Sequence, residues 1–214
     1  MELVSIAAEE YAARFSFAED ELLQALNLQT NETHTNAHML SGHVQGSFLT
    51  LLSCLLQPKK VLEIGTFTGY SAISMAEGMP DDGVLHTIDY DDELESFLND
   101  VFAKSEQAHK IKLHIGDALT VIDGMKEIFD LVFIDADKEE YLAYYEAVLP
   151  KVRQGGYMLV DNTLWDGKVL KPVDPKDKET IAIMKFNEFI AKDTRIEKVL
   201  LPVRDGLTLI RKIG

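Results

Sequence analysis

From residue 60 onward the chain alternates short apolar runs with amphipathic segments, and this alternation constrains the fold more than any other feature. Five runs have the length and composition of strands: residues 60–64, 84–88, 111–115, 131–134 and 157–160. Helical spacing lies between them, over residues 70–79, 92–107, 118–125 and 139–149. Strands that are apolar on both faces and alternate with helices predict a parallel sheet. Right-handed crossovers then give a doubly wound α/β sheet, which binds ligands beyond the carboxyl ends of its strands.

The two ends of the chain depart from this alternation. Further helices are expected over residues 4–15, 18–28, 42–56 and 178–191. Ser16-Phe17-Ala18-Glu19 has the form of a capping box that would start the second of them. Near the end, Arg204-Asp205-Gly206 joins two β-prone runs and predicts an antiparallel hairpin. We therefore expect one domain over residues 1–214, in which residues 1–57 supply N-terminal helices and residues 58–214 form a seven-stranded, mostly parallel core.

The charge of the chain limits its partners. The 214 residues carry a formal net charge of −15, whereas binding to nucleic acid requires a basic stripe that neutralises phosphates. Nucleic acid is therefore not an expected partner. The acidity serves either solubility or the attraction of cationic small molecules.

The N-terminal residues and the cysteine content favour a reducing, aqueous compartment. Met1-Glu2-Leu3-Val4 is soon followed by acidic residues, so we expect no signal peptide. The apolar runs of the sequence look too short to span a membrane, so no membrane partner is expected. Cys54 is the only cysteine, which excludes an intrachain disulfide, and we expect it to be a buried apolar thiol. The expected location is cytoplasmic.

The loop after the first core strand has the features of a cofactor-binding turn. Glu63-Ile64-Gly65-Thr66-Phe67-Thr68-Gly69 follows a strand and opens a helix, and Gly65 permits a sharp turn close to a ligand. The G-x-x-x-G spacing is neither the pyrophosphate fingerprint G-x-G-x-x-G nor a P-loop. Glu63 has the wrong charge for a phosphate neighbour but suits an amine or a sulfonium cation.

Acidic residues end the next two strands. Asp89 follows the second strand, where a carboxylate can accept both hydroxyls of a ribose, and Asp117 lies in the next loop, which can line an adenine. Each residue alone is explained equally well as the cap of the following helix. Features of this kind in three consecutive loops at one sheet edge favour an adenosine-containing cofactor.

Hard oxygen ligands end the fourth and fifth strands. Asp135 follows the fourth strand, and Asp161-Asn162 follows the fifth. Carboxylate and amide oxygens suit Mg²⁺ or a similar cation, whereas no pair of histidines or cysteines nearby suits zinc. The alternative is that the two aspartates cap the segments that follow them.

These motifs together resemble one family. The segment Leu62-Glu63-Ile64-Gly65-Thr66-Phe67-Thr68-Gly69-Tyr70-Ser71 is similar to the caffeoyl-CoA and catechol O-methyltransferases, as are Phe133-Ile134-Asp135-Ala136-Asp137-Lys138 and Asp161-Asn162-Thr163-Leu164-Trp165. The resemblance extends from about residue 39 to residue 209. It implies a Rossmann-like class I methyltransferase fold, S-adenosylmethionine as the cofactor, and a homodimer.

The resemblance also implies contacts with the cofactor. Glu63 would lie near the methionine amine, Ser71 would bind the methionyl carboxylate, and Asp89 would bind the ribose hydroxyls. Ala118 would contact the adenine through its backbone. The full implied set is Met39, Ser41, Glu63, Gly65, Thr66, Ser71, Asp89, Ala118 and Asp137.

By the same resemblance Asp135, Asp161 and Asn162 hold a divalent cation, either Mg²⁺ or another such as Mn²⁺ or Ca²⁺. Chelation of two vicinal hydroxyls of a small aromatic acceptor would lower the phenolic pKa from its ordinary value of about 10. The expected reaction is an in-line displacement by this metal-chelated phenolate on the sulfonium methyl. Lys138 would be the general base; its alternative is a solvated lysine paired with Glu139 or Glu140. Trp165 either stacks on the acceptor or covers the end of the sheet.

The sequence leaves two other classes of function open. A nicotinamide-dependent oxidoreductase would share the doubly wound core, but the missing G-x-G-x-x-G and the terminal hairpin count against it. A non-catalytic adenosylmethionine-binding protein would not need Asp135, Lys138, Asp161 and Asn162 all to be present.

Overall fold

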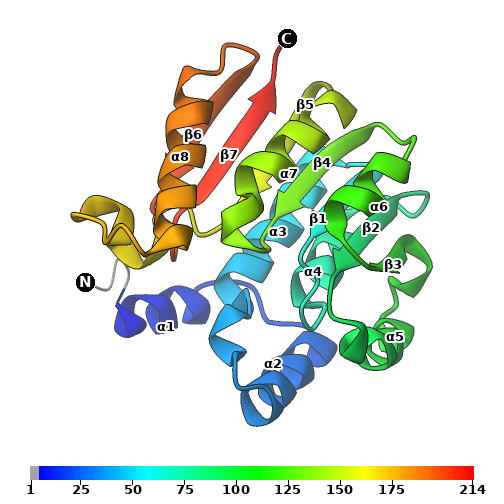
Figure 1. Ribbon diagram of the computed structural model, residues 1–214. Helices are drawn as coiled ribbons and strands as arrows, with labels where there is room; N and C mark the ends of the chain where they lie inside the picture. The colour runs from blue at the N-terminus through cyan, green and yellow to red at the C-terminus, as the bar shows by residue number, and fades with distance from the viewer. Residues whose placement is uncertain (1–4) are drawn as a thin grey trace. The chain divides into compact units, whose positions relative to one another are not determined.

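A computed structural model describes residues 5–214, without the side chain of Ile6, and contains a seven-stranded sheet in the order β3-β2-β1-β4-β5-β7-β6 (Figure 1). The strands are β1 (Lys60–Ile64), β2 (Val84–Asp89), β3 (Ile111–Ile115), β4 (Phe129–Ile134), β5 (Val152–Val160), β6 (Ile196–Leu201) and β7 (Leu207–Lys212). β2 pairs with β3 and β4 with β5 in parallel, whereas β7 is antiparallel to both β5 and β6. The predicted α/β sheet with a terminal antiparallel hairpin is confirmed.

Helices occupy most of the predicted positions. The α-helices are α1 (Ile6–Arg14), α2 (Glu21–Thr33), α3 (Gly42–Leu56), α4 (Tyr70–Gly78), α5 (Glu95–Lys104), α6 (Ala118–Gly124), α7 (Tyr141–Val148) and α8 (Lys178–Lys192). Short 3-10 helices include η1 (Ala37–Met39), η2 (Asp92–Leu94), η4 (Lys138–Glu140) and η6 (Trp165–Leu170). The expected start of the first helix at residue 4 lies outside the described residues.

The chain divides into two compact units. The first unit contains residues 6–61 and 66–117, and the second contains residues 62–65 and 118–214. In the first unit α3 packs along α4, where the hydroxyl of Thr50 donates to the carbonyl of Ser74 at 2.8 Å. In the second unit the rings of Tyr141 and Tyr145 both meet Phe186 edge-on, which joins α7 to α8.

The second helix differs from its prediction at both ends. Asp20 caps α2 by accepting from the backbone N–H of Leu22 at 2.8 Å, so the capping box predicted at residues 16–19 is wrong. The hydroxyl of Ser16 donates to the carbonyl of Ala12 instead and closes the end of the first helix. The helix also continues to Thr33, because Thr30 in this polar stretch is fully buried and bonds to Thr68. Tertiary packing thus outweighs local composition here.

The third helix corrects two further expectations. Cys54 is exposed, and the prediction of a buried thiol is wrong because the buried face of α3 carries Leu49 and Ser53 instead. The 20 residues of 37–56 also have the length and apolar composition of a membrane-spanning helix, so the judgement that every apolar run is too short was wrong for this segment. Its packing against α4 and its partial burial favour a core helix of the first unit.

Candidate active site

Two carboxylates lie side by side at the ends of neighbouring strands in the second unit. β4 and β5 pair with Ile134 opposite Val160, and Asp135 and Asp161 follow these two residues directly. The backbone N–H of Asp161 donates to the carbonyl of Ile134 at 3.0 Å, which continues the pairing beyond the strands. The local cause is the one expected from the sequence: parallel apolar strands end at the same edge and carry their first polar side chains there.

Asn162 adds an amide to this pair. Its backbone has a φ of 55°, a left-handed conformation that asparagine adopts more readily than most residues. The backbone N–H of Asn162 donates to Oδ1 of Asp161 at 2.8 Å, and its side-chain Nδ2 donates to Oδ2 of Asp205 at 3.3 Å. Because the nitrogen of the amide is directed at Asp205, its oxygen points away from that carboxylate.

Lys138 lies at the same edge with most of its side chain covered. Its Nζ is 3.0 Å from Oδ1 of Asp135 and 2.7 Å from the hydroxyl of Tyr141, and its side chain is 11% exposed. These partners replace the pairing with Glu139 or Glu140 that was the alternative for this residue. An amine in this position can exchange a proton with a hydroxyl placed near the carboxylates.

Tyr141 completes the immediate surroundings of Lys138. Burial raises the pKa of Tyr141 well above its ordinary value, and the charges of Asp135, Asp161 and Asp205 raise it further. Its hydroxyl therefore stays protonated and accepts the hydrogen bond from Lys138. Tyr141 thus helps to hold the lysine in place.

The donor set fits a hard divalent cation. Asp135, Asp161 and Asn162 offer two carboxylates and one amide oxygen, which are the ligand types that Mg²⁺, Mn²⁺ and Ca²⁺ prefer. Within residues 5–214 no three His, Cys, Asp or Glu side chains gather as a metal cluster, so a cation at this edge would need the amide oxygen of Asn162 beside the two carboxylates. Waters and acceptor oxygens would complete the coordination.

The turn after β1 approaches this edge very closely. Gly65 has a φ of 98°, and a Cβ added there would lie 1.9 Å from the carbonyl oxygen of Asp135. The prediction that Gly65 serves a sharp turn is confirmed, and its approach to a ligand stays a prediction. Glu63, two residues earlier on the strand, is fully buried.

In the first unit Asp89 organises the loop that follows Gly65. Its Oδ2 accepts from the backbone N–H groups of Thr66 and Phe67 at 3.0 and 2.7 Å, and its Oδ1 accepts from Asp91 N–H at 3.0 Å. The bond to Asp91 is a turn within the loop and not the helix cap considered from the sequence, because Asp91 itself caps η2. The bonds to Thr66 and Phe67 show that the carboxylate also fixes the predicted cofactor loop. An ionised carboxylate has about four acceptor sites, so one remains for a ribose hydroxyl, and not the two that the sequence suggested.

Most of the other predicted cofactor residues lie at the starts of helices. Ser41 immediately precedes α3 and Ser71 lies in the first turn of α4, and both are buried. Met39 ends η1 and is half-exposed. In the second unit Ala118 is the first residue of α6, and Asp137 is exposed and accepts from Glu139 N–H at 2.9 Å, which starts η4. Asp137 thus has a capping role, and its contact with the cofactor stays a prediction.

Trp165 opens η6 with a φ of 48°. The ammonium groups of Lys168 and Lys138 lie 4.9 and 5.8 Å from the ring centroid. Its indole N–H is buried and has no hydrogen-bond partner among the described residues. The ring therefore stands beside Lys138, where it can contact an acceptor or cover the strand ends.

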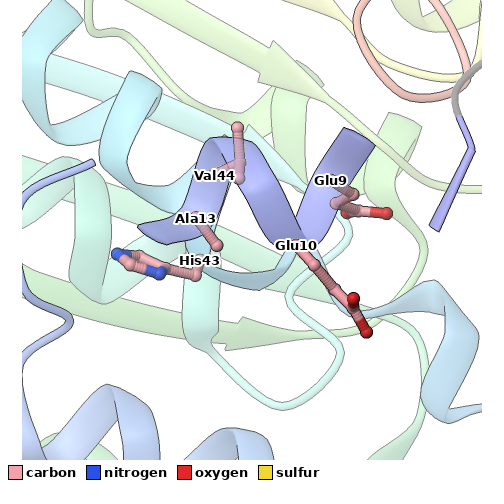
Figure 2. Close-up of a pocket in the computed structure, with 5 residues that line it drawn as sticks. All are labelled: Glu9, Glu10, Ala13, His43 and Val44. Atoms are coloured by element: carbon pink, nitrogen blue, oxygen red, sulfur yellow. The ribbon is translucent and has the colours of Figure 1, made fainter. Parts of the chain in front are cut away.

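A separate cavity of about 200 Å³ lies between α1 and the start of α3 in the first unit. Figure 2 shows its lining, with Glu9, Glu10 and Ala13 from α1 and His43 and Val44 from α3. None of the residues predicted for the cofactor, the cation or the base lines this cavity. Its wall combines the apolar Ala13 and Val44 with the polar Glu9, Glu10 and His43.

The sequence pattern does not mark two residues of the site. It places Tyr141 within a helix, where its position three residues after Lys138 puts the two side chains on one helical face. It places Asp205 in a turn, whereas the contact of Asp205 with Asn162 joins positions 43 residues apart. No local pattern reveals a contact of that separation.

Comparison with known proteins identifies the family. Residues 13–213 match the family model described as O-methyltransferase. The chain is 39% identical over 187 residues to caffeoyl-CoA O-methyltransferase 2 of Petunia hybrida, covering 82% of this chain and 77% of the relative. A caffeoyl-CoA O-methyltransferase of Petroselinum crispum is 38% identical over a similar span, with 82% and 78% covered.

Solved structures agree with this result. The SAH-bound methyltransferase PaMTH1 of Podospora anserina superposes with a TM-score of 0.89 at 28% identity, covering 97% of this chain and 94% of that one. The O-methyltransferase TomG of Streptomyces achromogenes, solved in complex with SAM, gives a TM-score of 0.87 at 29% identity, with 97% and 96% covered. These matches are to methyltransferases, and they support neither a nicotinamide-dependent oxidoreductase nor a non-catalytic protein. The chain therefore belongs to the O-methyltransferase family, within which it is similar to the caffeoyl-CoA O-methyltransferases.

Proposed function

We propose that this protein transfers the methyl group of S-adenosylmethionine to one hydroxyl of a small aromatic acceptor with vicinal hydroxyls, and that the transfer depends on a divalent cation. S-adenosylmethionine-dependent O-methylation follows from the family. The cation and the type of acceptor are the proposal. The observation that carries it is the placement of Asp135, Asp161 and Asn162 beside Lys138 at one end of β4 and β5.

The three oxygen ligands give a reason for a vicinal diol. A cation held by Asp135, Asp161 and Asn162 supplies positive charge that lowers a phenolic pKa and fixes the direction of an oxygen. Two adjacent hydroxyls fit one cation better than a single hydroxyl does, because both can bind it at once. Trp165 offers an aromatic face near Lys138 for a planar acceptor.

The reaction then requires one proton transfer and one displacement at the methyl group. Nζ of Lys138, after releasing its own proton to solvent, would take the phenolic proton, so that the O–H bond breaks as an N–H bond forms. The phenolic oxygen would then displace the sulfonium methyl; the C–S bond would break as the O–C bond forms, giving S-adenosylhomocysteine and a methyl ether. Tyr141 and Asp135 hold Lys138 in place, so the protein contributes mainly position and the exclusion of water.

Each cofactor-binding group is assigned by its chemistry. Asp89 has an acceptor site for a ribose hydroxyl, and the amide groups of Thr66 and Phe67 that it fixes shape the loop. Glu63 carries a carboxylate that would pair with the methionine ammonium. A homodimer and a cytoplasmic location stay predictions of the sequence.

An acceptor screen tests the proposal. Methyl transfer from labelled S-adenosylmethionine to catechol, hydroxycinnamoyl thioester and flavonoid acceptors is measured with Mg²⁺ and with EDTA. We expect transfer to vicinal diols that EDTA abolishes and that Asp161→Ala loses, whereas Asp123→Asn, an exposed carboxylate on α6, retains it. Full methylation of a catechol by Asp161→Ala in EDTA would show that the cation has no part in the reaction.

A further inference from the structure

The loop that carries Asn162 holds an unusual backbone. Asn162, Trp165 and Asp166 have φ values of 55°, 48° and 51°, and Gly167 follows with 68°. Residues other than glycine adopt such angles at a cost, and they persist where the surrounding structure fixes them. The loop therefore needs an external support.

The turn between β6 and β7 supplies that support. The backbone N–H groups of Thr163 and Leu164 donate to the carbonyls of Gly206 and Asp205, each at 2.9 Å. A Cβ on Gly206 would lie 2.5 Å from the nitrogen of Leu164, so this close approach requires glycine. Further along β7, the hydroxyl of Thr208 donates to that of Thr163 at 2.9 Å.

Asp205 is the residue of this turn whose side chain reaches the candidate cation site. Its Oδ1 accepts the backbone N–H of Asp166, and its Oδ2 accepts from Nδ2 of Asn162 at 3.3 Å. A carboxylate can only accept, so it tolerates the nitrogen end of the Asn162 amide and repels the oxygen end. Asp205 therefore keeps the nitrogen of the Asn162 amide toward itself and the amide oxygen turned away.

We propose that Asp205 is a positioning residue, which fixes the Asn162 amide with its oxygen available to the divalent cation. The inference rests on the proposed function, because it takes Asn162 as a cation ligand. It assigns to the hairpin a task beyond closing the sheet: the turn selects the coordinating atom. Groups that orient metal ligands in this way change metal affinity by about 10- to 100-fold when they are altered.

The isosteric variant Asp205→Asn separates this role from support of the loop. The side-chain oxygen of the new asparagine can still accept from the backbone N–H of Asp166. Its NH2 group then faces the NH2 group of Asn162, and two donors cannot form a hydrogen bond. We expect Asn162 to turn over and present nitrogen to the cation. The added change Asn162→Asp should rescue the variant, because a carboxylate accepts from the new amide and still offers oxygen.

Binding of Mn²⁺ without acceptor, followed by electron paramagnetic resonance of the free ion, is the measurement. We expect Asp205→Asn to bind Mn²⁺ about 10- to 100-fold more weakly, with S-adenosylhomocysteine affinity and metal-free Trp165 fluorescence unchanged. The double variant should recover the affinity. Asp174→Asn is the control, because Asp174 also accepts a backbone N–H in a turn, from Lys176 at 2.9 Å.

The outcomes separate the two levels of the proposal. If the unaltered protein binds Mn²⁺ no better than Asp161→Ala does, the cation site itself is wrong and the proposed function fails with it. If the unaltered protein binds Mn²⁺ but Asp205→Asn binds it equally well, only the positioning role is overturned. The positioning role is also overturned if Asp205→Asn and the double variant with Asn162→Asp bind Mn²⁺ equally weakly. Should Asp205→Asn fail to fold, Asp205→Glu keeps the charge but moves the carboxylate, and undiminished Mn²⁺ affinity there would reject the role.

Discussion

The side-chain nitrogen of Lys138 lies 3.0 Å from Oδ1 of Asp135, so the proposed base and a proposed cation ligand form an ion pair. The pair holds the lysine at the ends of the strands, where its side chain is 11% exposed. Under the proposed function, Lys138 and a cation would share one carboxylate.

Replacing Lys138 tests the base. We expect Lys138→Met to lower kcat by about 10²- to 10⁴-fold because general-base catalysis contributes that much. Mn²⁺ affinity should not fall, since a competing positive charge has been removed from Asp135. Lys126→Met, at an exposed position in the same unit, is the control. A pH–rate profile that is unchanged in Lys138→Met would end the assignment.

Adding one methyl group at Gly65 tests the close contact between the β1 turn and Asp135. We expect Gly65→Ala to lower the free energy of unfolding by about 2–4 kcal/mol, from the positive φ and the contact with the Asp135 carbonyl. Gly124→Ala is the matched control, because a Cβ there meets nothing within 4 Å; we expect a change within about 1 kcal/mol. Urea denaturation measures both, and equal effects would contradict the contact.

The carboxylate of Asp89 is expected to bind the cofactor directly and to hold its loop. We expect Asp89→Asn to weaken S-adenosylhomocysteine binding at least about tenfold, since hydrogen bonds to a charged group contribute about 1.5–3 kcal/mol each. Asp91→Asn should change it little, because Asp91 caps η2 by accepting from Glu93 N–H. Calorimetric titration compares them, and an unaltered affinity in Asp89→Asn would remove Asp89 from the site.

Acid stability should depend on Asp193. Hydrogen bonds from Arg195 hold the pKa of Asp193 well below its ordinary value, and the hydroxyl of Tyr145 also donates to it at 2.8 Å. A carboxyl whose folded pKa is lowered stabilises the protein above its ordinary pKa of about 3.9, and this contribution is lost as the pH falls below it. Asp193→Asn should therefore be about 1 kcal/mol less stable at pH 7, and the difference should shrink toward pH 2. A constant difference from pH 7 to pH 2 would contradict the ion pair.

Much of the architecture could be read from local patterns. The strands 60–64 and 111–115 were placed within their observed bounds, because apolar runs between turn residues are a local signal. The hairpin at Asp205-Gly206 followed from turn chemistry alone. The strand-end carboxylates Asp135 and Asp161 were found for the same reason, since the ends of parallel strands share one edge.

The features that the sequence predicted wrongly depend on contacts between residues that are distant in the chain. Helix α2 extends through its polar half because Thr30 bonds to Thr68, 38 residues away. Cys54 is exposed because the packing of α3 selects which of its faces is buried. Neither choice is encoded in the neighbouring residues.

By itself the sequence determined the order of the elements, the acidic strand ends and the resemblance to O-methyltransferases, because periodicity and strand-end chemistry are local properties. Only the tertiary structure paired Lys138 with Asp135 and Tyr141, and turned the amide of Asn162 toward Asp205. Hydrogen-bond direction depends on which donor meets which acceptor across the fold, and chain order alone does not fix that.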